Sequence, residues 1–327
     1  MNPLLGIGIP AYKRPDQLRR CLASVAAAAR PYGVPVYVLD DSGDDTNAAV
    51  LAAAQQAYGE IRHVRNPATL GIDRNILNSV EACECRYAWL LGEDDRLTPD
   101  AVEKMLQALA GEPAFVFANY STVNEEVTAV LREKALPLDA DADQDAAEFL
   151  ARHGWAAGFI GGCVVNRALW RTAPQAPYVG TFFAHVGVIF HSIRGRQIHL
   201  VAQPLVLNRC GTATAFTWQS KTFEVLGGWE RLMTALRPLY GQAVCDRSLA
   251  SFECAHGLNS LKFLLYLRAG GAYGPRQFDA YIRPARRGIW YTAAAWWVAR
   301  SNRKLVHLAH RLLARIRQQR GRRITGY

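Results

Sequence analysis

The chain has 327 residues, of which 50% are hydrophobic and 20% are charged, a composition typical of an ordinary globular protein. At this length we expect one main domain with a C-terminal elaboration. The net charge of +10 lies in the C-terminal segment, because residues 283–327 contain twelve Lys and Arg and no Asp or Glu, and the rest of the chain has a net charge of −2. A nearly neutral main domain lacks the broad basic surface typical of nucleic-acid-binding proteins, and we expect no nucleic-acid partner.

The cysteines and the N-terminus indicate the compartment. Seven cysteines are scattered along the chain without the spacing of a metal site, which favours a reducing cytosol. The first sixteen residues have no basic region before a long apolar stretch and no small-residue cleavage site, so they do not predict a signal peptide. We therefore expect the mature chain to start here and to be cytoplasmic, or peripheral on the inner face of the cell membrane.

The first 124 residues alternate between strand and helix patterns. This alternation predicts an α/β fold in which helices flank a mainly parallel sheet on both faces. Thr98 and Gly111 are the expected start and stop signals of one helix. The expected strands are 4–10, 34–40, 61–66, 86–92 and 114–124, and the expected helices are 16–29, 44–58, 71–83 and 98–111.

Beyond residue 131 the pattern changes to an acidic loop that enters a helix near residue 146. A Gly-rich apolar segment at 158–170 follows, and residues 179–193 predict a helix that carries His185 and His191. Residues 198–211 return to strand character, and apolar positions between 223 and 268 predict two or three helices. We divide the chain into a catalytic domain, 1–220, and a helical C-terminal region, 221–327.

The C-terminal region ends in a basic segment that begins with the apolar run 289–299. Eleven residues are too few to cross a bilayer, which takes about 20. Its Trp and Tyr residues next to basic residues favour binding of 283–327 to an anionic membrane surface, whereas a helix packed on the body with a solvated basic side is the alternative. The residues expected on one helix face are Trp297, Ser301, Leu305, Leu308, Leu312 and Ile316.

Two of the predicted strands end in acids. Asp40 and Asp41 follow the strand at 34–40, and Glu93, Asp94 and Asp95 follow the strand at 86–92. Ligands of open α/β sheets bind beyond the carboxyl ends of the strands, where these acids would repel one another unless a cation were present. Oxygen ligands favour Mg²⁺ or Mn²⁺ carrying a diphosphate, and the alternative for residues 93–95 is a solvated turn that caps the next helix.

Four segments in order over the first 105 residues resemble the family 2 glycosyltransferases of the GT-A fold. They read IGIPAYKRPDQLRRCLASV, VYVLDDSGDDT, NPATLGIDRN and YAWLLGEDDRLTPDAVEKM. The resemblance implies a Rossmann-like GT-A domain with a helical C-terminal extension. It also implies an inverting enzyme that moves a sugar from a nucleotide diphosphate donor to an acceptor.

The resemblance assigns residues to the nucleotide. Asp41 is expected to bond the base, which favours UDP or dTDP because a carboxylate accepts from a pyrimidine ring N–H; guanine, which could make the same contact, is the alternative. Arg74 stands where the family has the start of its ARN helix and is expected to contact the base or a phosphate. The loop after the first strand is expected to pack along the base through Pro10, Tyr12 and Arg14.

The acidic triplet resembles the DxD metal motif but departs from it, because Gly92 stands where many relatives have the first carboxylate. Asp94 is therefore the expected ligand of Mn²⁺ or Mg²⁺. Glu93 or Asp95 is expected to reach the ribose, a metal-bound water or the acceptor.

The acceptor side departs further from the family. Relatives have an Asp or Glu as base near the start of a helix, where this chain has Phe183, Ala184 and His185. His185 is thus the local candidate for the base that deprotonates the acceptor hydroxyl, with a buried structural histidine as the alternative. Asp95 and Glu148 are the other candidate bases. Gly161 and Gly162 with Trp155 and Phe159 are the expected acceptor floor, and tight packing is the alternative.

The predicted function is transfer of a sugar to a saccharide or lipid-linked saccharide in cell-surface polysaccharide or glycolipid synthesis. Arg209 is expected to contact the donor phosphates from a segment that resembles the family's closing loop. A sugar nucleotidyltransferase is one alternative, although the loop after the first strand lacks its glycines. A degenerate, non-catalytic transferase that acts as a membrane-associated assembly partner is the other.

Overall fold

The structure is a computed structural model that describes residues 3–210, 221–258, 260–283 and 288–308. Contacts divide the chain into two compact units. Unit 1 contains Met1–Thr212 and Gly228–Phe252, and unit 2 contains Ala213–Gly227 and Glu253–Tyr327. The expected boundary between residues 220 and 221 falls inside the short segment that belongs to unit 2.

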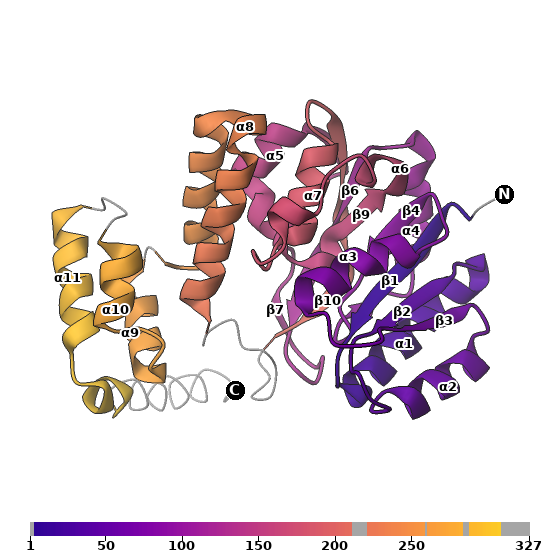
Figure 1. Cartoon of the computed structure of the whole chain (residues 1–327), viewed down its shortest axis with the longest axis horizontal. Helices are drawn as coiled ribbons and strands as arrows, with labels where there is room; N and C mark the ends of the chain where they lie inside the picture. The colour runs from indigo at the N-terminus through magenta and orange to yellow at the C-terminus, as the bar shows by residue number, and fades with distance from the viewer. Residues whose placement is uncertain (1–2, 211–220, 259, 284–287, 309–327) are drawn as a thin grey trace, which may run out of the picture. The chain divides into compact units, whose positions relative to one another are not determined.

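Unit 1 is built on one large sheet (Figure 1). The strands follow the order β3-β2-β1-β4-β9-β6-β10-β5, with β7 paired to β6 and β8 paired to β10. Their bounds are β1 Leu5–Ala11, β2 Val36–Asp40, β3 Ile61–Arg65, β4 Tyr87–Leu90, β5 Arg96–Leu97, β6 Phe115–Val123, β7 Val130–Arg132, β8 Ala142–Asp145, β9 Cys163–Asn166 and β10 Gln197–Arg209.

Most of the long strands point the same way. β1 pairs in parallel with β2 and β4, β2 with β3, and β6 with β10. β9 is antiparallel to both β4 and β6, so β4 and β6 are parallel to each other across it. The carboxyl ends of β1, β2, β4, β6 and β10 therefore meet at one edge of the sheet, as the sequence predicts.

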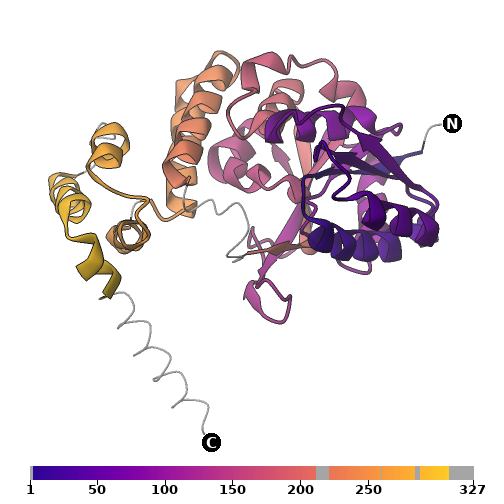
Figure 2. The ribbon, with the colours of Figure 1, turned by 60° about the horizontal axis from the view of Figure 1, so that its bottom comes forward.

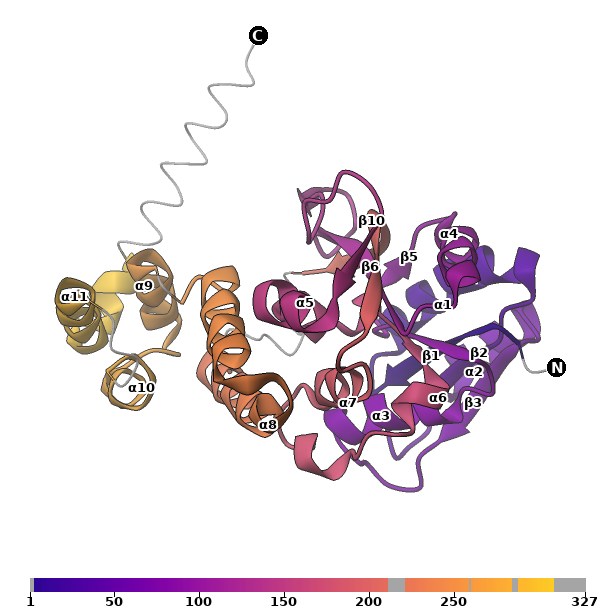
Figure 3. The ribbon, with the colours of Figure 1, turned by 90° about the horizontal axis from the view of Figure 1, so that it is seen from above.

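Helices cover both faces of this sheet (Figures 2 and 3). On one face α1 packs against α2 and α4, and on the other α7 packs against α3 and α6. In α1 the apolar residues Leu18, Leu22 and Val25 lie at helical spacing and are all buried, as expected of a helix that packs on the sheet. The bounds are α1 Pro15–Ala29, α2 Ala48–Ala57, α3 Ile72–Ala82, α4 Ala101–Ala108, α5 Ala146–His153, α6 Arg167–Trp170 and α7 Ala184–Ser192.

The core lies where the central strands are covered on both faces. Every residue of β2 and β4 is buried, as expected for parallel strands between two helical layers. Two short strands that the sequence analysis did not predict, β5 and β9, complete the path of the sheet. The long helix α8, Thr222–Ala255, is interrupted at Gly241, which has a φ of 79°.

Unit 2 contains helices α9 (Leu261–Gly270), α10 (Pro275–Gln277) and α11 (Ile289–Arg300). α9 packs against α11, and the Tyr273 hydroxyl donates to the carbonyl of Ala295 at 3.0 Å. No helix within the described ranges has the length and apolar character needed to cross a membrane. Of the predicted tail positions, Leu312 and Ile316 lie outside the described residues.

Candidate active site

Loops from three strands are tied together at the carboxyl edge of the sheet. After β1, the backbone N–H of Tyr12 donates to Glu93 Oε2 at 2.8 Å, and that of Lys13 donates to Ser42 Oγ at 3.0 Å. These bonds fix a turn in which Lys13 has a φ of 51°. The Tyr12 residue remains 47% exposed, so its ring is available to stack on a ligand.

Asp40 and Asp41, at the end of β2, bind different loops. The Asp40 carboxylate accepts from the Ser42 hydroxyl at 2.5 Å and from Asn47 Nδ2 at 3.0 Å, so it closes its own loop. Asp41 instead reaches the loop before α3. Its carboxylate accepts from Asn66 Nδ2 at 2.9 Å and from the backbone N–H groups of Leu70 at 2.8 Å and Gly71 at 3.0 Å.

These bonds decide how much of Asp41 is left for a ligand. A carboxylate offers about four acceptor positions, and the loop uses three of them. Asp41 is also only 2% exposed. The residue therefore first shapes the loop 66–71, and the loop leaves one acceptor position of its carboxylate unused.

The first turn of α3 lies at the same edge. Asn75 Nδ2 donates to the carbonyl of Leu39 at 3.2 Å and contacts that of Ala11 at 3.4 Å. Asn75 thereby fastens the helix to the ends of β1 and β2. Arg74, next to it, is exposed, as its predicted role in ligand binding requires.

The acidic triplet after β4 is only partly open to solvent. Glu93 is 7% exposed and Asp95 is 3% exposed, whereas the Asp94 side chain keeps 25% of its exposure. Two arginines from distant strands face Asp94: Arg14 Nη1 lies 3.3 Å and Arg209 Nη2 lies 3.5 Å from its Oδ2. The backbone N–H of Arg209 also donates to Asp95 Oδ1 at 3.2 Å.

Burial changes the acidity of the triplet. It raises the pKa of Glu93 to about 8, against the opposing effects of the Tyr12 N–H and Arg14. Burial and the neighbouring Asp94 also raise the pKa of Asp95. Carboxylates gathered in this way favour binding of a cation, because a cation stabilises their ionised forms.

The side chains at this edge offer few ligands of their own for the expected Mn²⁺ or Mg²⁺. Within the part of the chain that the structure describes, no group of three or more His, Cys, Asp or Glu side chains is arranged to bind a metal by itself. Mg²⁺ in phosphate-transfer sites needs only one or two carboxylates together with substrate phosphates. The partly exposed Asp94, flanked by arginines that suit phosphates, fits that arrangement.

The predicted base His185 lies in the core. It is 1% exposed, its Nε2 lies 3.0 Å from the carbonyl of Ala157, and its Nδ1 has no hydrogen-bond partner. Burial lowers the pKa of His185 to about 4, so the ring is neutral at pH 7. This environment is the one expected of a structural histidine, and the role of His185 as base stays a prediction. Of the other two candidates, Asp95 lies beside Arg209 at the sheet edge. Glu148 lies in the first turn of α5, where its Oε1 is 3.0 Å from Arg247 Nη2.

The predicted acceptor floor is well packed. A Cβ atom added to Gly161 would lie 2.7 Å from the ring of Phe159, and one added to Gly162 would lie 2.9 Å from Phe117. Gly161 is packed against Phe159, and Gly162 against Phe117 of β6, which agrees with the alternative of tight packing. Trp155 is half-buried, and the guanidinium of Arg132 lies 5.4 Å from its ring centroid.

One carboxylate at this edge was not singled out from the sequence. Asp73, in the first turn of α3, accepts from the backbone N–H groups of Gly180 at 2.7 Å and Phe182 at 3.2 Å. The signal in the sequence was the acid directly before Arg74, in the segment that resembles the ARN motif.

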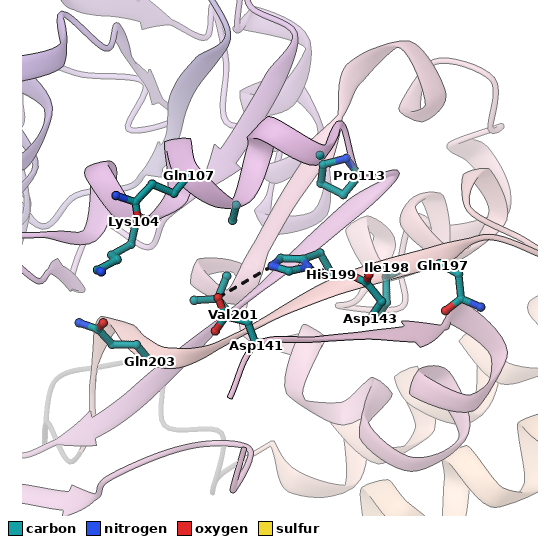
Figure 4. A pocket seen from close by; sticks show the side chains of 12 residues that line it. Lys104, Gln107, Pro113, Asp141, Asp143, Gln197, Ile198, His199, Val201 and Gln203 are labelled. Carbon is teal, nitrogen blue, oxygen red and sulfur yellow. Dashed lines mark hydrogen bonds and ion pairs between the residues drawn. The ribbon is translucent and has the colours of Figure 1, made fainter. Parts of the chain in front are cut away.

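The structure also has a cavity of about 710 Å³ at the opposite end of β10 from Arg209 (Figure 4). His199 lies there between two carboxylates, with Nδ1 2.8 Å from Asp143 and Nε2 4.0 Å from Asp141. The predicted site residues are absent from its lining. The candidate active site is therefore the edge of the sheet that carries the acids, and not this cavity.

The order of the strands and the helical layers on both faces of the sheet are those of the GT-A fold. A family model described as "Glycosyl transferase family 2" matches residues 7–168. The protein is a glycosyltransferase and belongs to this family. The match covers the four segments on which the resemblance depends.

Named relatives agree with this class. The chain is 23% identical over 238 residues to abequosyltransferase RfbV of Salmonella typhimurium, covering 68% of this chain and 71% of the relative. Crystallised TarS of S. aureus in complex with UDP-GlcNAc has a TM-score of 0.58 at 12% identity, covering 94% of this chain and 92% of that one. The mannosyltransferase PcManGT of Pyrobaculum calidifontis, solved with GDP-Man and Mn²⁺, has a TM-score of 0.52 at 14% identity, with 94% and 88% covered. The structural likenesses confirm the fold.

Proposed function

We propose that the protein transfers a sugar, with inversion, from a nucleotide diphosphate donor to a saccharide or lipid-linked saccharide acceptor. The observation that carries this proposal is the meeting of Asp94 with Arg14 and Arg209 at the carboxyl edge of the sheet. A carboxylate between two arginines suits a diphosphate with a divalent cation, because the carboxylate can bind the cation while the guanidinium groups donate to phosphate oxygens.

The nucleotide lies along the loop after β1 in this proposal. The exposed ring of Tyr12 stacks on the base, and the remaining acceptor position of Asp41 receives a base N–H. Pro10 shapes the wall beside them, and the exposed Arg74 contacts a phosphate or the base at the start of α3. UDP and dTDP are the favoured donors because uracil and thymine each have a ring N–H for the Asp41 carboxylate; guanine, which also has one, is the alternative. Glu93, whose Oε2 already fixes the Tyr12 turn, reaches the ribose.

Asp94 would bind the divalent cation together with the donor phosphates. When bound, such an ion acts as a Lewis acid that stabilises the charge on the leaving diphosphate. Arg14 and Arg209 contribute to the same end, because each guanidinium can turn from Asp94 to a phosphate oxygen. Asp95 accepts the backbone N–H of Arg209 and so fixes the strand end that carries this arginine.

The name of the RfbV relative supports a role in the synthesis of cell-surface polysaccharide, with a lipid-linked saccharide as acceptor. Helix α11 supports a membrane location for that acceptor. Ile289 is 78%, Trp290 87% and Trp297 65% exposed, and residues 283–327 contain twelve basic and no acidic residues. Exposed tryptophans beside basic residues are typical of a segment that lies on an anionic membrane surface. A cytoplasmic protein peripheral to the inner face of the membrane fits these features.

An assay of nucleoside diphosphate release tests this proposal. The protein is incubated with UDP-, dTDP-, GDP- or CDP-sugars, Mn²⁺ and a lipid extract that contains the lipid-linked saccharide acceptor. The proposal predicts release that depends on both the acceptor and the cation, and a product of inverted anomeric configuration by NMR. Glu103→Gln, an exposed change in the first turn of α4, is the matched control and should leave the rate unchanged. Release without any dependence on acceptor would contradict the proposal.

A further inference from the structure

Helix α7 begins without an acid of its own. Its first positions are Phe183, Ala184 and His185, and the last of these is buried against the Ala157 carbonyl. A direct displacement at the sugar still needs a group that takes the proton of the acceptor hydroxyl. A carboxylate must therefore come from another element if this end of α7 takes part in the reaction.

Asp73 brings a carboxylate to this position from α3. Its Oδ2 accepts from the N–H groups of Gly180 at 2.7 Å and Phe182 at 3.2 Å, and its Oδ1 lies 3.4 Å from the N–H of Ala184. These are the backbone groups that precede and open α7. The contact is direct because α3 and α7 pack side by side (Figure 3). Asp73 thus occupies the place of a capping carboxylate at the start of α7.

The same residue belongs to the donor edge of the sheet. Two residues before it, the Gly71 N–H bonds Asp41 at 3.0 Å, and two residues after it, Asn75 bonds the carbonyl of Leu39 at 3.2 Å. The first turn of α3 is therefore anchored on both sides to the edge where the nucleotide is proposed to bind. Asp73 links this edge to the start of α7.

The two oxygens of Asp73 are used unequally. Oδ2 receives two backbone N–H groups and Oδ1 has a single contact of 3.4 Å with the Ala184 N–H, while the Thr181 N–H also acts on the carboxylate and Asp73 is 7% exposed. Burial raises the pKa of Asp73, which makes its carboxylate a stronger base. The bonded loop contains Gly180 with a φ of 90° and Phe182 with a φ of 67°. A left-handed residue other than glycine is strained, and such strain is concentrated at functional sites.

We infer that Asp73 is the catalytic base of the acceptor hydroxyl, an inference that rests on the proposed glycosyl transfer. The acceptor oxygen forms a bond to the anomeric carbon while its O–H bond breaks and the proton passes to Asp73 Oδ1. The bond from the anomeric carbon to the phosphate oxygen breaks, and its electron pair leaves with the nucleoside diphosphate. The Oδ2 bonds keep the carboxylate in place through this step.

The test compares Asp73→Asn with the wild type and with the control Glu103→Gln. Asparagine keeps an oxygen for the Gly180 N–H but cannot take a proton. We expect kcat of transfer to fall by about 100-fold or more, while the Kd of UDP or dTDP stays within about twofold. The acidic limb of the pH profile of kcat/KM should disappear.

If the Asp73→Asn protein does not fold, Asp73→Ser is measured instead, because the serine hydroxyl can also accept a hydrogen bond from the loop. Transfer within about threefold of the wild type in a folded variant would overturn the inference. A rise in acceptor KM with kcat retained would also overturn it, because that result describes a structural tether. If the wild type itself neither binds donor nor transfers sugar, the proposed function fails and not this inference alone.

Discussion

The carboxylate of Asp95 occupies the space that a side chain on Gly92 would need. A Cβ atom added to Gly92 would lie 2.4 Å from Asp95 Oδ2 and 3.3 Å from Asp94 Oδ1. The turn is closed by a backbone bond from the Asp95 N–H to the Gly92 carbonyl at 3.1 Å. The glycine that departs from the usual motif is thus required by the way the other acids fold back.

This relationship predicts the effect of Gly92→Ala. The added methyl group forces Asp95 away, and a shift of about 1 Å near reacting groups costs on the order of 100-fold in rate. We expect kcat to fall by about 10- to 100-fold and the free energy of unfolding to fall by about 1–3 kcal/mol, measured by steady-state assay and urea denaturation. Gly111→Ala is the control, because its added Cβ meets nothing within 4 Å. Equal behaviour of the two variants would contradict the prediction.

Asp41→Asn tests the carboxylate that shapes the loop before α3. Asparagine has one acceptor oxygen, so the buried arrangement loses a partner for the Leu70 or the Gly71 N–H, at a cost of about 1–3 kcal/mol. We expect that loss of unfolding free energy in urea denaturation and an affinity for UDP or dTDP at least about tenfold weaker. Asp45→Asn, on an exposed side chain of the same loop region, should change neither quantity. Unchanged stability of Asp41→Asn would show that these bonds contribute little.

His185 predicts a dependence of stability on pH. Its pKa is lowered to about 4 in the folded protein, below the usual 6.5, so the fold favours the neutral ring. This contribution is complete above pH 6.5 and is lost as pH falls from 6.5 toward 4, up to about 3 kcal/mol in all. His185→Gln should therefore show a shallower loss of unfolding free energy over that range than the wild type. The exposed His307→Gln should keep the wild-type slope; equal slopes for all three proteins would refute the assignment.

The exposed tryptophans of α11 predict membrane binding. A Trp290→Ser, Trp297→Ser double variant should sediment with phosphatidylglycerol vesicles about tenfold or more weakly, because two large apolar side chains no longer enter the interface. Leu131→Ser is the control, since Leu131 is an exposed apolar residue of unit 1 at 60%. Binding that is unchanged in the double variant, or equal on uncharged vesicles, would mean that α11 does not bind anionic lipid.

The sequence predicted the half of the fold in which strands and helices alternate regularly along the chain. The alternation of apolar runs and amphipathic stretches up to residue 124 was sufficient for the parallel strands and their helices, and the acids after β2 and β4 follow from strand ends. The strands β5 and β9 were not predicted, because a pair of residues and a Gly-rich segment have too little periodicity.

The sequence predicted only those site residues that directly follow the end of a strand. Tyr12, Arg14 and the triplet were found from their order along the chain. The bonds from Asp73 to Gly180 span more than one hundred residues, so only the packing of α3 on α7 reveals them. The sequence predicted the helix that carries His185, but it did not show that this residue is buried in the core.

The most direct test of the account is calorimetric titration of UDP and dTDP into the wild type and Asp94→Asn, each with Mn²⁺ and with EDTA. Asp94 is the most exposed member of the triplet and faces both arginines, so its charge is the one proposed to hold a cation together with a diphosphate. We expect the nucleotide to bind the wild type at least about tenfold more weakly in EDTA, and we expect Mn²⁺ to have no effect on its binding to Asp94→Asn. Equal nucleotide affinity of the wild type with and without the cation, or an equal effect of Mn²⁺ in Asp94→Asn, would contradict the proposed role of Asp94.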